Sequence, residues 1–272
     1  MPTYTAFCKA PLVNPSYVPL SPTAVHAEGY LADCLAALPR PQSADARLLA
    51  ALMAGETPDL PPLDAPLTLD ALPDELALLH AVLPAATLQK DKDCVVRLLT
   101  RVRELGTLLS TLPEERVAPI GADCLRLCVE LYRRTGHKFL LTMMAELRSL
   151  LPDFAGFYHS FPFVKPFVPG DAPEDATDSH AAYQRRMALL ATGRHTAEGL
   201  AITALLGQYS GSGRETAAAK AGLAALWRYH GLPLGSFSAD PMLAGRDPAE
   251  SADLPTLCAL TEAYADLLCA QG

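Results

Sequence analysis

The sequence has few charged side chains, few aromatic side chains and no basic cluster. Only 19% of its 272 residues are charged and 7% are aromatic, with a single Trp. The net charge is −8 and Lys and Arg are scattered, which argues against a nucleic-acid partner. No run of apolar residues is long enough to span a bilayer, and the first twenty residues lack the basic and then apolar pattern of a secretion signal. Neither a membrane partner nor export is therefore expected.

Paired cysteine motifs are also absent. The seven Cys residues form an odd set with no C-x-x-C pair, which is typical of a reducing compartment and predicts a cytoplasmic protein. Cys124 and Cys128 are four residues apart and share one helix face, so a metal site was considered. Because no further Cys or His lies within a helical turn of them, they are interpreted as core residues.

Hydrophobic residues make up half of the chain, and Leu and Ala dominate. This composition with no alternating β pattern predicts an all-α protein built from antiparallel helical hairpins. No fixed repeat is evident, so an irregular toroid is favoured over a solenoid. An extended Pro-rich arm is expected over residues 1–22, followed by a single α-helical domain over 23–272.

Two segments carry the clearest helical signals. Residues 94–111 place apolar side chains at helical spacing, with Arg97, Arg101, Arg103 and Glu104 on the face expected to be solvated. Residues 121–151 are typical of a helical hairpin that turns at Thr135-Gly136. Further helices are expected from about Thr23 and over 44–53, 180–190, 195–209, 214–229 (with Leu223, Leu226 and Trp227 buried) and 255–269, with loops over 152–179 and 230–258.

Two motifs resemble a known family. One is Leu-Tyr-x-x-Thr-Gly-x-x-Phe-Leu-Leu over 131–141. The other comprises His230-Gly231, Gly235-Ser236-Phe237-Ser238, Asp240-Pro241, Leu243-Ala244-Gly245, Pro248 and Pro255-Thr256-Leu257-Cys258. This pattern resembles the β-L-arabinofuranosidase-like glycoside hydrolases, which are zinc- and cysteine-containing (α/α)-barrel enzymes. The resemblance implies an incomplete, toroid-like (α/α) barrel without the family's C-terminal β-sandwich.

The resemblance also indicates what has changed at the catalytic positions. Cys258 matches the family's zinc-bound cysteine, so it is the candidate metal ligand and, with Asp240, the candidate catalytic position. The acid/base Glu is replaced by Pro241 and a zinc-ligand Glu by Thr256. The resemblance therefore implies a truncated pseudoenzyme of carbohydrate metabolism that lacks standard catalysis. Zinc is the cofactor that the family suggests, but with these ligands replaced no cofactor is expected.

Substrate-binding candidates come from the same comparison: His195, His230, Phe237 and Asp240, with a carbohydrate as the ligand. Two alternatives stay open. The chain is an active glycosidase with rewired carboxylates, for which Asp247, Glu250 and Asp253 are candidates, or it is a helical carbohydrate-binding or subunit protein. Since an incomplete toroid exposes apolar helix faces, a homodimer is also expected.

Overall fold

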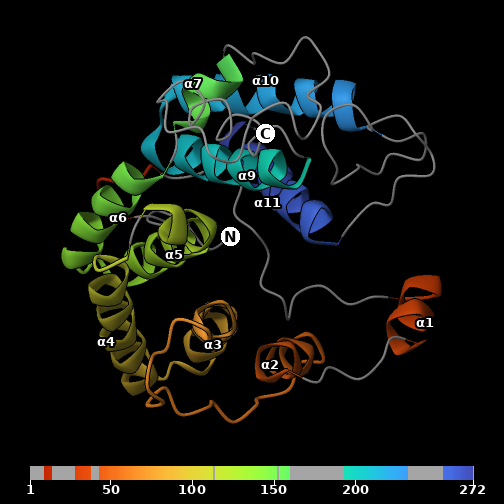
Figure 1. Ribbon diagram of the computed structural model, residues 1–272. Helices are drawn as coiled ribbons and strands as arrows, with labels where there is room; N and C mark the ends of the chain where they lie inside the picture. The colour runs from red at the N-terminus through yellow and green to blue at the C-terminus, as the bar shows by residue number, and fades with distance from the viewer. Residues whose placement is uncertain are drawn as a thin grey trace. The chain divides into compact units, whose positions relative to one another are not determined.

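The structure is a computed structural model that describes residues 9–13, 28–37, 43–112, 114–151, 153–159, 193–231 and 254–271. The chain divides into two compact units, which are described separately (Figure 1). Unit 1 comprises Met1–Val18 and Pro152–Gly272, and unit 2 comprises Pro19–Leu151. The described residues form helices and no strand, which confirms the all-α prediction. None of these helices is long and apolar enough to cross a membrane. The incomplete barrel and the single domain over 23–272 stay predictions.

Unit 2 is built on helix α3, which contacts α2, α4 and α5. Its helices are α1 (Tyr30–Ala37), α2 (Ala44–Met53), α3 (Leu72–Gln89), α4 (Lys92–Leu109), α5 (Glu114–Thr135) and α6 (Phe139–Leu150). Leucines supply most of the core, and Leu79, Leu98, Leu105 and Leu131 are completely buried. The expected helix over 44–53 is confirmed as α2.

Helix α3 was not predicted. Its buried residues include the continuous run Ala81, Val82 and Leu83, and His80 is the only polar residue between Leu76 and Ala86. The middle of this helix has no polar face, so it lacks the periodicity by which amphipathic helices are recognised in a sequence. Pro73 lies in its first turn, where helices accept proline, and Pro84 lies inside it.

Helix α4 confirms the predicted amphipathic segment with one correction. Leu98, Val102 and Leu105 are buried as expected. Arg101 was expected on the solvated face but is only 4% exposed, and its Nε lies 2.5 Å from Glu75 Oε1 of α3. Because α3 covers this face, Arg101 is buried against a carboxylate partner rather than against water.

Helices α5 and α6 confirm the predicted hairpin. Gly136 ends α5 with a positive φ of 72°, and its N–H donates to the carbonyl of Tyr132 at 2.8 Å. Glycine accepts this left-handed conformation without strain, as the sequence indicated. Helices α5 and α6 pack against each other (Figure 1).

Unit 1 is a layer of three long helices with a short one beside it. They are α7 (Phe154–His159), α9 (Gly193–Ser210), α10 (Gly213–His230) and α11 (Leu254–Gln271). Helix α9 lies between α10 and α11, and α7 packs mainly on α10 (Figure 1). Two expectations are corrected here: α7 lies inside a segment predicted as a loop, and Trp227 is 55% exposed rather than buried. Residues 23 and 180–190, where further helices were expected, lie outside the described residues.

The core of unit 1 consists mostly of alanine. Ala197, Ala201, Ala204, Ala218 and Ala263 are buried together with a few leucines. Small side chains allow helix axes to approach closely, at about 8 Å rather than 10 Å. The three helices are therefore packed with little space for larger side chains.

Candidate functional site

Buried polar side chains are concentrated in unit 1. The described ones are Thr196, Thr203, Gln208, Glu215, Thr216, Thr256 and Asp266, whereas unit 2 contributes Arg101. A buried polar group destabilises the fold unless it has a partner, so such groups often mark places where function constrains a sequence. The buried polar side chains of unit 1 lie on α9, α10 and α11, which are therefore the helices expected to carry a site.

A pocket of about 340 Å³ lies where the end of α9, the start of α10 and the end of α11 meet. Its walls are formed by Val13, Gly207, Gln208, Gly211, Gly213, Thr216, Ala217, Lys220 and Ala270. All of these residues belong to unit 1, although Val13 is almost two hundred residues from the others in sequence. Its volume falls at the lower end of the range for small-molecule sites, about 300–1,000 Å³.

The sequence of the α9–α10 turn explains how this end of the layer forms. Ser212 is the N-cap of α10, and Glu215 lies three residues later, the spacing of a capping box. The Ser212 hydroxyl donates to the Glu215 carboxylate, and Thr216 N–H donates to the Ser212 carbonyl at 3.3 Å. Glu215 is therefore bound by the hydroxyl of the N-cap residue.

Gly207 allows α9 and α10 to approach closely beside the pocket. A Cβ atom at this position would lie 2.7 Å from Thr216 Oγ1 and 3.0 Å from Thr216 N. Because Thr216 N is a backbone atom, it cannot move aside by a side-chain rotation. Only glycine fits at position 207 without separating the helices.

The N-terminal segment supplies one wall of the pocket. Val13 N–H donates to the Tyr209 carbonyl at 2.8 Å. The Val13 side chain covers Gly211, with Cγ2 3.0 Å from the position that a Cβ of residue 211 would occupy. Part of the arm expected over residues 1–22 is thus fixed to the end of α9.

Gln208 is the most informative side chain in the wall. It is only 3% exposed, and its Oε1 has no hydrogen-bond partner among the described residues. Leaving a buried acceptor unpaired destabilises a fold by about 1–3 kcal/mol. A buried oxygen beside a pocket of this size is the arrangement expected where a ligand or a water molecule donates the missing hydrogen bond.

The other polar groups of the pocket differ in exposure. Thr216 is 7% exposed, and its hydroxyl donates to the Ser212 carbonyl at 3.1 Å, so its remaining capacity is as an acceptor. Lys220 is exposed and lies one turn further along the same face of α10. The pocket therefore presents acceptors at its buried end and a cation at its open end.

The residues predicted from the sequence lie elsewhere. His195 is in the first turn of α9, His230 is the last residue of α10, and Cys258 is near the start of α11. Because α9 and α10 form a hairpin and α11 ends beside the end of α9, these three positions share the end of the layer opposite the pocket. Phe237 and Asp240, and the alternative carboxylates Asp247, Glu250 and Asp253, lie outside the described residues.

Cys258 and Thr256 do not face the same side of α11. Thr256 is completely buried, whereas Cys258 is an exposed free thiol. Residues two apart on a helix do not share a face. These two motif positions therefore do not converge on one ion, and zinc binding by Cys258 stays a prediction.

The cysteines of unit 2 whose side chains the structure describes, Cys94, Cys124 and Cys128, are buried free thiols. Cys124 and Cys128 touch on α5, and the hydrogen bond between the two thiols, together with burial, raises the pKa of Cys128 well above its ordinary value. A raised pKa keeps a thiol protonated and unreactive at neutral pH. Across the described ranges, no three His, Cys, Asp or Glu side chains are grouped so that they could hold a metal ion.

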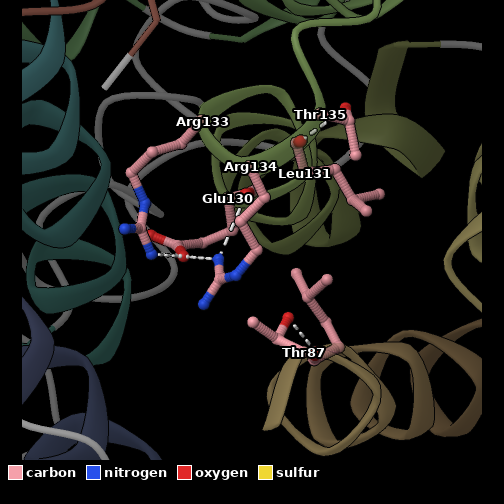
Figure 2. Close-up of polar contacts among 7 residues, drawn as sticks. Thr87, Glu130, Leu131, Arg133, Arg134 and Thr135 are labelled. Carbon is pink, nitrogen blue, oxygen red and sulfur yellow. Dashed lines mark hydrogen bonds and ion pairs between the residues drawn. The ribbon is translucent and has the colours of Figure 1, made fainter. Parts of the chain in front are cut away.

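The strongest charge cluster of unit 2 lies at the end of α5. Figure 2 shows the guanidinium groups of Arg133 and Arg134 converging on Glu130, and Arg133 Nη2 lies 2.6 Å from its Oε2. Burial alone would raise the pKa of Glu130, but Arg134 and Arg133 outweigh it and lower the pKa to about 2. The Thr135 hydroxyl donates to the Leu131 carbonyl at 2.7 Å in the same turn. The ion pairs of this cluster stabilise the last turns of α5.

Comparisons with known proteins leave the site to be argued from its own geometry. No protein-family model, no curated protein and no solved structure matches the chain.

The sequence contained a signal for the turn beside the pocket, but none for the pocket itself. Ser212 and Glu215 have the spacing of a capping box after a glycine, which predicts that α10 begins beyond Ser212. The burial of Gln208 had no such signal, because it depends on how α10 and α11 cover α9.

Proposed function

We propose that the chain is a glycoside-hydrolase-like helical protein that binds a small polyhydroxylated ligand without standard glycosidase catalysis. The observation that carries this proposal is the buried, unpaired Oε1 of Gln208 in the wall of a pocket of about 340 Å³. Hydroxyl groups are donors that would satisfy this oxygen. The resemblance of the sequence to sugar-processing enzymes supports the same class of ligand.

The absence of standard catalysis is argued from two replaced side chains. Hydrolysis in the resembled family requires a carboxylic acid that protonates the leaving oxygen, and Pro241 has no proton to give. A zinc-activated thiolate requires anionic ligands around the metal, and Thr256 is a neutral side chain buried away from Cys258. The chain is proposed to retain binding and to have lost turnover.

The test is calorimetric titration of the full chain with L-arabinose, D-galactose and D-glucose, beside an assay for release of p-nitrophenol from its β-L-arabinofuranoside. We expect binding without turnover. Ala217→Trp, which fills the pocket, should abolish binding, whereas Ala224→Trp, two turns along α10 and also exposed, should not. Measurable turnover, or binding that survives Ala217→Trp, would contradict the proposal.

A second copy of the chain is the proposed protein partner. Helix α11 exposes Leu254 by 72%, Leu268 by 62% and Tyr264 by 44%. Exposed apolar side chains at such spacing are typical of helix–helix interfaces. Light scattering should give about twice the chain mass of 29.0 kDa, and Leu268→Glu should reduce it to one chain. A wild-type protein of single-chain mass would contradict this.

A further inference from the structure

We infer that the pocket takes a polyol bearing one anionic group, such as a sugar acid or a sugar phosphate, with hydroxyls at Gln208 and the anion at Lys220. This inference rests on the proposed function, because it assumes that the pocket binds a small polyhydroxylated ligand. It adds the charge of that ligand and the direction in which it enters.

The buried end of the pocket selects hydroxyl donors. Gln208 Oε1 is buried and unpaired, and the Thr216 hydroxyl has already used its hydrogen towards Ser212. Both groups therefore accept hydrogen bonds from whatever occupies the pocket. A carboxylate or phosphate against these two oxygens would place an acceptor against acceptors, and the amide N–H groups of Gln208 carry no charge, so the anionic group is placed at the cation instead.

The open end of the pocket selects an anion. Lys220 is exposed and forms no ion pair with a described carboxylate. Arg214, the other cation at the start of α10, is already bound by Asp153, with Nη2 2.8 Å from its Oδ2. Of these two cations, Lys220 is therefore the one that can bind an anionic ligand.

The geometry of α10 makes the two ends part of one site. Gly213, Thr216, Ala217 and Lys220 follow each other at helical spacing along a single face, about 10 Å from first to last. The Cβ direction of Gly213 is open, with no atom within 4 Å. A six-carbon chain can extend along this face from the buried acceptors to the ammonium group.

The experiment compares D-gluconate and D-glucose 6-phosphate with D-glucose and hexanoate by calorimetry on the full chain. At least one of the two anionic polyols should bind about 10-fold to 100-fold more tightly than D-glucose or hexanoate, since a charge-assisted hydrogen bond is gained. Which of the two binds more tightly distinguishes a carboxylate from a phosphate ligand. Raising the salt concentration should weaken the binding.

Variants separate this inference from the proposed function. Lys220→Met should remove the preference for the anion, Lys220→Arg should keep it, and Lys92→Met in unit 2 should change nothing. If the neutral sugar binds as tightly as the acids and Lys220→Met has no effect, the inference fails while the proposed function stands. If none of these compounds and none of the neutral sugars binds, both fail.

Discussion

The two units of this chain solve helix packing in different ways. In unit 2, leucines such as Leu79 and Leu131 fill the core, and the buried cation Arg101 is paired with a carboxylate. In unit 1, alanines bring α9, α10 and α11 together, and seven described polar side chains are buried among them. A fully apolar core needs only shape and volume, whereas buried polar groups add constraints that stability alone does not require. This contrast is why the proposed binding site is placed in unit 1.

The largest effect is expected from a cavity in the leucine core. Leu79→Ala removes a completely buried side chain of α3 and should reduce the free energy of unfolding by about 2–5 kcal/mol. Leu88→Ala is the matched control on the same helix, because Leu88 is 42% exposed. Urea unfolding measures both. Equal losses for the two variants would mean that α3 is not the buried centre of unit 2.

The charge cluster of unit 2 should make its stability dependent on pH. The pKa of Glu130 is about 2 in the folded state and about 4.3 in an unfolded chain. Its carboxylate therefore stabilises the fold above about pH 5, and this contribution is lost as the pH falls through about 4.5 towards 2. Glu130→Gln should cost about 2–3 kcal/mol at pH 7.

The measurement for this cluster is the free energy of unfolding of wild type and Glu130→Gln between pH 7 and pH 3. The difference should narrow as the pH falls. Glu146→Gln, at an exposed position of α6, is the control and should change little. A difference that stays constant with pH would show that the ion pairs of Glu130 do not contribute to the pH dependence of stability.

The alanine-packed unit should be sensitive to added rather than removed volume. Gly207→Ala places a Cβ against the backbone of Thr216 and should cost about 1–3 kcal/mol. Gly213→Ala, a few residues away, meets no atom within 4 Å and should be neutral or slightly stabilising. Thermal unfolding of the two single variants provides the comparison. If Gly207→Ala is also neutral, α9 and α10 are not in close contact at this point.

The smallest expected effect has the opposite sign. Gln208→Met keeps the length of the side chain and removes its unpaired oxygen, so the ligand-free protein should become more stable by about 1 kcal/mol. Gln89→Met should instead destabilise, because Gln89 Nε2 donates to the Pro58 carbonyl at 2.8 Å. Differential scanning calorimetry without ligand measures both. Destabilisation by Gln208→Met would show that its oxygen already has a partner in the free protein.

Sequence reasoning predicted the elements whose signals are local. The amphipathic face of α4 and the glycine that ends α5 can be recognised from this sequence alone. Helix α3 was missed because its middle, Leu76 to Ala86, has no polar face, and the burial of Arg101 was missed as a consequence. The pocket was missed because it requires Val13, Gln208 and Ala270, which only tertiary packing brings together.

The central claim is that a ligand binds at the α9–α10 turn rather than at the end that carries the family-like residues. The most direct measurement is a two-dimensional NMR titration of the isotope-labelled full chain with D-gluconate. The account predicts saturable shifts of the Gln208 side-chain amide and of the Gly211 and Gly213 backbone amides. Shifts confined instead to His195, His230 and Cys258, at the opposite end of the layer, would contradict it.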